Sequence, residues 1–107
     1  VRRYAPVGTL VFDEIDSGIG GGVADTVGRS LQRLGAERQV LCVTHLPQVA
    51  AQGDVQWSVR KTAQRGAVHV EVERLDRAAR VEELARMLGG AKITATTRRH
   101  AAELLGG

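Results

Sequence analysis

The sequence predicts an α/β fold in which two parallel strands with flanking helices precede a β-hairpin and two further helices. Three observations predict it. Thr9–Phe12 and Val40–Val43 are short apolar runs without polar alternation, and a segment of helical periodicity separates them. Residues 55–72 contain two stretches that alternate between apolar and polar side chains, which is typical of a hairpin. Helical spacing then returns in the carboxyl-terminal part of the chain.

The first strand is expected at Thr9–Phe12, because a continuous apolar run is typical of a strand that is buried on both faces. The next segment carries apolar residues at helical spacing, which predicts a helix that ends at Gly35. These apolar residues are Val23, Val27, Leu31 and Leu34. Val40–Val43 then forms a second buried strand. This order predicts a βαβ unit with parallel strands and a right-handed crossover.

Pro47 follows the second strand, and a proline there suits the first turn of a short helix that continues to Ala51. Beyond it, the alternating stretches predict an antiparallel hairpin with one solvated face and with Gly66 in the short connection. The apolar positions of this hairpin are Val55, Trp57, Val59, Val68, Val70 and Val72.

Two helices are expected after the hairpin. Arg77–Leu88 has one apolar stripe and stops at a pair of glycines, Gly89 and Gly90. The stripe consists of Val81, Leu84, Ala85 and Leu88. Thr94 is the expected N-cap of the last helix, which runs to about Leu105.

The predicted fold is incomplete on its own. Strands that are apolar on both faces need helices above and below and further strands on either side, and this chain offers too few strands to supply them. Either the sheet extends across a dimer or the other half lies on another segment. The second arrangement is the one that we expect.

Composition sets wide bounds on function. A chain of 107 residues with 43% hydrophobic and 25% charged residues is expected to form one soluble domain at most. A net charge of +3 permits contact with a polyanion without requiring it. The single cysteine, Cys42, suits a reducing cytosol, so a cytoplasmic location is expected. No apolar stretch approaches the roughly 20 residues that span a bilayer, so no membrane association is expected.

Three acids follow the first strand within four positions: Asp13, Glu14 and Asp16. They could bind a metal, activate a water or form a solvated turn. A carboxylate fixed at the end of a rigid strand suits Mg²⁺, usually held through water. The adjacent Glu could polarise an attacking water as a general base. If the two strands are parallel neighbours, His45 emerges at the same sheet edge, where ligands of open α/β sheets collect and a γ-phosphate could be contacted.

Each of these residues also has a structural interpretation. An isolated Asp after a strand is more often a turn former, and an isolated His is more often structural. The apolar run before Asp13, the third acid and the "TH" that ends the second strand together favour the functional interpretation. His69 and His100 are assigned no role.

The glycine cluster after the acids invites comparison with a dinucleotide-binding turn. The G-x-G-x-x-G spacing fails, because its last position falls on Val23 when counted from Gly18 and on Asp25 when counted from Gly20. The acids between strand and glycines would also repel a pyrophosphate. A P-loop is excluded as well, because no lysine precedes Lys61.

Three sequence motifs resemble those of a known family. "TLVFDE" looks like the Walker B strand of an ABC-type ATPase, "IDSG" stands in the place of its D-loop and "VTH" resembles its switch histidine. "VFDEIDSGIGG", "QVLCVTHLPQVAAQGD" and "ARVEELARMLGG" are similar to the C-terminal head segment of the bacterial RecN family of SMC-like DNA-repair proteins. The resemblance covers roughly Thr9 to Gly107.

The resemblance implies the C-terminal lobe of an ABC/SMC-type P-loop NTPase head that uses ATP and Mg²⁺. It assigns Asp13 to the metal site, Glu14 to the catalytic base and His45 to the γ-phosphate. It assigns the D-loop to nucleotide contacts across a dimer of heads, through Asp16, Ser17 and Gly18. The implied partners are an N-terminal lobe that carries Walker A and the signature motif, a second head and, through the complete protein, DNA. The implied location is the cytoplasm of a bacterium, associated with the nucleoid.

Two functional classes remain open. The chain is either the C-terminal part of a RecN-like ATPase in DNA double-strand break repair and recombination, or a non-catalytic binding module that retains the fold. The basic residues Arg60, Lys61 and Arg65 near the hairpin are interpreted as solvated surface rather than as DNA contacts.

Overall fold

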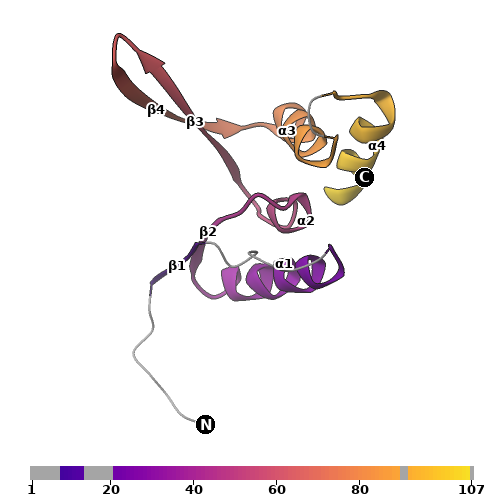
Figure 1. The fold of residues 1–107 in the computed structure, drawn as a ribbon. Helices are drawn as coiled ribbons and strands as arrows, with labels where there is room; N and C mark the ends of the chain where they lie inside the picture. Colours follow the sequence, from indigo (N-terminus) through magenta and orange to yellow (C-terminus); the bar gives the residue numbers. More distant parts are fainter. Residues whose placement is uncertain (1–7, 14–20, 90–91, 107) are drawn as a thin grey trace. The chain divides into compact units, whose positions relative to one another are not determined.

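The computed structural model describes residues 8–13, 21–89 and 92–106. Internal contacts divide the chain into two compact units, residues 1–52 and residues 53–107, and each is considered by itself. The first unit contains β1, α1, β2 and α2, and the second contains β3, β4, α3 and α4 (Figure 1). The mixed α/β character that the sequence predicts is therefore present, and the elements follow one another in the expected order.

The first unit is built on a parallel pair of strands. β1 (Thr9–Asp13) pairs with β2 (Gln39–Val43), and α1 (Gly21–Gly35) connects them. In the register of the pair, Thr9 lies opposite Gln39 and Asp13 lies opposite Val43, so both strands begin and end at the same level. This confirms the parallel pairing expected from the two apolar runs. The strands extend the predicted runs by one residue each.

The two faces of this pair differ in their exposure. Leu10, Phe12, Val40 and Cys42 share one face and are half-buried, and α1 contacts β2. On the other face Val11, Leu41 and Val43 are 67%, 48% and 61% exposed. The expectation of burial on both faces is therefore wrong for this chain. The two runs place apolar side chains on both faces of the strand pair. In the structure one face is half-buried and the other is exposed.

The most buried positions of α1 are occupied by small residues. Ala24 is fully buried and Gly28 is buried, whereas Val23 is 55% exposed and Leu34 is exposed as well. The contact partner at this face is α2 (Pro47–Ala50), the single turn that follows β2. Small side chains on α1 allow the two helices to approach closely. The apolar stripe that the sequence suggests is only partly the packing face.

The second unit begins with an antiparallel hairpin. β3 (Gln56–Gln64) pairs with β4 (Ala67–Leu75), with Gln64 opposite Ala67 at the end of the ladder. The two-residue turn consists of Arg65 at φ 51° and Gly66 at φ 77°. Two consecutive residues with positive φ match the right-handed twist of the flanking strands, which is why glycine is favoured here. The predicted hairpin and its Gly66 connection are confirmed.

From Val59 to Arg74 the hairpin is exposed on both of its faces. It extends away from α3 and α4 as a long ribbon (Figure 1). The four valines of its apolar face are between 57% and 69% exposed, namely Val59, Val68, Val70 and Val72. The expectation of a single solvated face is therefore wrong in this structure. The alternation predicted the pairing of the strands correctly, because pairing depends on the strands alone, whereas burial depends on what lies against them.

α3 (Arg77–Gly89) and α4 (Ala95–Leu104) pack against each other and hold the core of the second unit. Leu84, Ala85 and Ala101 are fully buried between them. Two of these three residues belong to the apolar stripe expected on the first helix. α3 begins after Asp76, whose Oδ1 accepts the amide hydrogen of Ala79 at 2.8 Å and so caps the helix.

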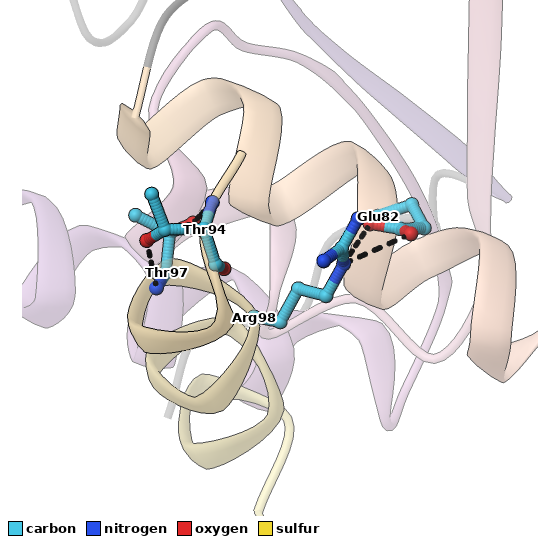
Figure 2. A network of polar contacts seen from close by, with 4 residues as sticks. All are labelled: Glu82, Thr94, Thr97 and Arg98. Atoms are coloured by element: carbon cyan, nitrogen blue, oxygen red, sulfur yellow. Dashed lines mark hydrogen bonds and ion pairs between the residues drawn. The ribbon is translucent and has the colours of Figure 1, made fainter. Parts of the chain in front are cut away.

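A capping box starts α4 at the expected residue. Thr94 Oγ1 accepts the amide hydrogen of Thr97 at 3.2 Å, and Thr97 Oγ1 accepts the amide hydrogen of Thr94 at 2.9 Å (Figure 2). Figure 2 also shows Arg98 of α4 reaching Glu82 of α3, with Nε at 3.1 and 3.0 Å from the two carboxylate oxygens. The N-cap predicted at Thr94 is confirmed. The capping box therefore fixes the start of α4, and an exposed ion pair links α4 to α3.

Arg80 ties α3 to the segment that precedes β3. Its guanidinium donates to the carbonyl oxygens of Gly53 at 2.8 Å and Asp54 at 3.4 Å, and to Oε1 of Gln56 at 3.2 Å. Gln56 is buried, so its amide oxygen needs a donor from within the protein. Burial lowers the pKa of Arg80, and the nearby charge of Arg77 lowers it further, while Asp54 acts in the opposite direction. A single half-buried side chain thus joins the hairpin to α3.

Candidate nucleotide site at the ends of β1 and β2

Asp13 and His45 are the two predicted site residues that the structure describes. Asp13 is the last residue of β1 and lies opposite Val43, the last residue of β2. His45 follows Val43 by one intervening residue, Thr44. Because the strands are parallel and in level register, both residues belong to the same, carboxyl-terminal edge of the pair. Both side chains are exposed and so are accessible to a ligand.

The backbone on either side of His45 is held in place. On one side Val43 is fixed by its pairing with β1. On the other side Thr44 Oγ1 accepts the amide hydrogen of Leu46 at 3.0 Å, and Pro47 then begins α2. The carbonyl oxygen of Leu46 accepts the amide hydrogens of Val49 and Ala50 at 3.1 and 3.0 Å. The proline suits this position because its fixed φ is helical and its missing N–H would have no helical acceptor.

α2 in turn rests on α1 at Gly28. A Cβ placed on Gly28 would lie 2.8 Å from Cγ of Gln52, 3.0 Å from the carbonyl oxygen of Gln48 and 3.3 Å from Cα of Val49. Sequence reasoning passed over this residue. The available signal was a glycine in the middle of a helical segment, which costs about 0.5–1 kcal/mol relative to alanine and therefore calls for a packing reason.

The remaining predicted site residues, Glu14, Asp16, Ser17 and Gly18, lie outside the described residues. Their grouping with Asp13 and His45 is therefore still a prediction. Within 8–13, 21–89 and 92–106, no cluster of three or more His, Cys, Asp or Glu residues could bind a metal ion. Mg²⁺ bound with nucleotide commonly takes only one or two protein carboxylates and completes its shell with phosphates and water. An exposed carboxylate at a rigid strand end fits that donor set.

The two other histidines belong to the second unit. His69 lies on β4, where it lines a shallow hollow at the hairpin tip together with Gln64, Arg65 and Ala67. His100 is exposed on α4. Over the described part of the chain, no helix combines the length and the apolar character needed to cross a membrane.

The chain has close relatives among known proteins, although no family model matches it. DNA repair protein RecN of Xylella fastidiosa strain Temecula1 is 52% identical over 99 residues, which are 92% of this chain and 18% of the relative. RecN of Mycobacterium tuberculosis strain H37Rv is 51% identical over 104 residues, and RecN of Vibrio cholerae is 50% identical over 97 residues. The chain therefore spans less than a fifth of the length of the relatives that it matches.

The fold has a solved counterpart. A chain from structural work on "ATP-driven dimerization and DNA stimulated activation of SMC ATPases" superposes with a TM-score of 0.60. The match covers 81% of this chain and 52% of that chain, at 17% sequence identity. At this identity the likeness concerns the fold alone. Taken with the identities of 50–52% to RecN proteins, it makes this chain a RecN-like segment with the fold of an SMC ATPase.

Proposed function

We propose that this chain is the C-terminal part of a RecN-like ATPase head that acts in DNA double-strand break repair and recombination. The observation that supports this most directly is the level, parallel register of β1 and β2, with Asp13 at the end of one strand and His45 just beyond the end of the other. A level sheet edge can present a carboxylate and an imidazole to the same phosphate chain.

Asp13 is the residue that we assign to the metal. Asp13 stands at the end of a strand that pairs with β2, so the sheet positions its backbone. Asp13 would hold a Mg²⁺ ion, and that ion would supply positive charge to offset the negative charge of the phosphates.

Glu14 is assigned the role of general base, because it directly follows Asp13 in the stretch that resembles a Walker B strand. His45 is assigned to the γ-phosphate, to which its ring can donate a hydrogen bond. Asp16, Ser17 and Gly18 are assigned to contacts with nucleotide and with a second head. These roles follow the resemblance to Walker B, D-loop and switch-histidine motifs.

The proposed head needs partners that this chain does not supply. Phosphoryl transfer requires donors that cradle the β- and γ-phosphates, and the sequence has no lysine before Lys61 and no P-loop. An N-terminal lobe of the same head would provide them, a second copy of the head would close the site, and the complete protein would engage DNA. The proposed setting is the bacterial cytoplasm, in association with the nucleoid.

A reconstitution experiment tests this proposal. The 107-residue chain is assayed for Mg-ATP binding and hydrolysis alone, and again together with a separately produced N-terminal lobe of the same protein. We expect negligible hydrolysis by the chain alone and activity in the mixture. Robust turnover by the chain alone would contradict the proposal that an N-terminal lobe must supply the phosphate-binding donors. Absence of nucleotide binding and turnover in a stably associated mixture would favour a non-catalytic module instead.

A further inference from the structure

Gly28 lies at a close contact between α1 and the segment that contains α2. The three heavy atoms nearest to a Cβ added at this position belong to Gln48, Val49 and Gln52, which lie in α2 or directly after it. Two of the three are backbone atoms, the carbonyl oxygen of Gln48 and Cα of Val49. A rotation of a side chain cannot move backbone atoms away. A residue larger than glycine at position 28 therefore requires one of the two helices to shift.

α2 has little freedom to absorb such a shift locally. It is a single turn of four residues, and its side chains Pro47 and Val49 are buried. Gly35, on the same α1, provides a contrast, because nothing lies within 4 Å of the Cβ it lacks. Of these two glycines, only Gly28 lies in a close contact, and this contact explains a glycine at a helix interior where alanine would otherwise be favoured by about 0.5–1 kcal/mol.

A displacement of α2 is expected to move His45 as well, because Leu46 connects the two directly. Leu46 is the N-cap of α2, and its amide hydrogen is bound by Thr44 Oγ1 at 3.0 Å. His45 lies between these two residues, while β2 immediately before them is fixed by its pairing with β1. The backbone at His45 is therefore set on one side by the sheet and on the other by α2.

We infer that Gly28 is a positioning residue for His45: the absence of a side chain at position 28 allows α1 to hold α2, and thereby His45, at the sheet edge where Asp13 ends β1. The inference rests on the role proposed above for His45. A carbon atom added at Gly28 requires its neighbours in α2 to move by a few tenths of an ångström. A misplacement of about 1 Å can reduce catalysis on the order of 10²-fold, so this smaller shift is expected to have a smaller effect.

The test uses the full-length RecN-like protein with the substitution Gly28→Ala, and Gly35→Ala as the matched control on the same helix. Three quantities are measured: kcat for ATP hydrolysis, Kd for nucleotide and the hydrogen-exchange rates of the amides of Ala50 and Ala51. These amides bond to the carbonyls of Leu46 and Pro47 at 3.0 and 2.9 Å, so they report the integrity of α2. We expect Gly28→Ala to lower kcat at least about tenfold, to raise both exchange rates and to leave Kd within about twofold. Gly35→Ala should change none of them.

A second substitution separates positioning from general damage. Gln52→Ala removes the Cγ atom that lies 2.8 Å from the added carbon. In the double variant, kcat and the two exchange rates should return part of the way towards the parent values, whereas a protein that had simply misfolded would not recover. The inference is overturned if Gly28→Ala retains the parent kcat, or if kcat falls with no change at Ala50 and Ala51.

The proposed function is read out separately by His45→Gln in the same assays. A His45→Gln protein with the parent kcat would remove the role assigned to His45, whatever the exchange data for Gly28→Ala show. A His45→Gln protein with a lowered kcat, beside a Gly28→Ala protein with the parent kcat, would leave that role standing and overturn the positioning inference alone.

Discussion

Asp13 lies opposite Val43 in the parallel register of β1 and β2, so the two strands end at the same level and His45 follows just beyond that edge. This relationship places a carboxylate and an imidazole, distant in the sequence, at one edge of the first unit. What that edge does, and what holds the structure of each unit in place, can be tested by single substitutions.

Asp13→Asn should weaken metal binding rather than remove the reaction. The substitution keeps the size of the side chain but removes the negative charge that favours Mg²⁺. In the full-length protein we expect the Mg²⁺ concentration for half-maximal ATP hydrolysis to rise on the order of tenfold, as is common when a residue that acts through metal-bound water is changed. Raised Mg²⁺ should restore most of the rate. A titration of the steady-state rate with Mg²⁺ measures this.

Asp25→Asn is the matched control for that experiment. Asp25 lies on α1 and pairs with Arg29 across one helical turn, at 3.0 Å between carboxylate and guanidinium on an exposed surface. Such a pair contributes little to stability. Its loss should leave the Mg²⁺ requirement unchanged. An equal shift for both variants would mean that the requirement reflects overall charge and not Asp13.

Arg80→Lys should loosen the junction between α3 and β3. A lysine can keep the charge, but it cannot direct several N–H groups at once towards Gly53, Asp54 and Gln56. The loss of hydrogen bonds to a charged, half-buried group costs about 1–3 kcal/mol, which corresponds to about a 5- to 150-fold increase in local opening. Hydrogen exchange of the amides in residues 54–57 and in the first turns of α3 measures that opening.

Arg77→Lys serves as the control for Arg80→Lys, because Arg77 is exposed at the start of the same helix. It should leave exchange in both segments within about twofold of the parent rates, as is usual for surface substitutions. If Arg80→Lys also left exchange unchanged, the hydrogen bonds of Arg80 would not be what holds this junction.

Thr94→Ala should destabilise the first turn of α4. It removes the oxygen that accepts the Thr97 amide at 3.2 Å, and the loss of an N-cap costs about 1 kcal/mol. The amides of Thr97 and Arg98 should therefore exchange about fivefold faster. Thr96→Ala, at an exposed position in the same turn, should not accelerate them. Equal acceleration by both substitutions would show that side-chain propensity, and not capping, governs this helix end.

The elements whose signals are local could be predicted from the sequence. Thr94 was recognisable as an N-cap and Gly66 as a turn residue, because capping and positive φ depend on a few neighbouring residues. The parallel pairing of β1 with β2 followed from two apolar runs joined by a helix, since few connections of that length are available to parallel strands.

Burial could not be predicted in the same way. Val11 and Val59 carry apolar side chains of the kind that is usually buried in a strand, yet they are 67% and 62% exposed. Apolar character indicates that a face favours coverage, but not which element covers it. The contact partner of Gly28 could not be predicted either. Its place in the middle of a helical segment suggests a packing role, but only the structure shows that α2 is what it packs against. At the candidate site, the shared sheet edge of Asp13 and His45 could be predicted, because both residues follow strands that were expected to be parallel neighbours.

In the proposed ATPase site Glu14 is the general base, and single-turnover ATP hydrolysis by Glu14→Gln in the full-length protein measures whether it has that role. Glutamine keeps the shape of the side chain and removes the base, so the rate should fall on the order of 10²–10⁴-fold while nucleotide binding survives and unhydrolysed ATP holds two heads together. Glu82→Gln, which alters the exposed pair with Arg98, should hydrolyse ATP at the parent rate. Hydrolysis by Glu14→Gln at close to the parent rate would contradict the assignment.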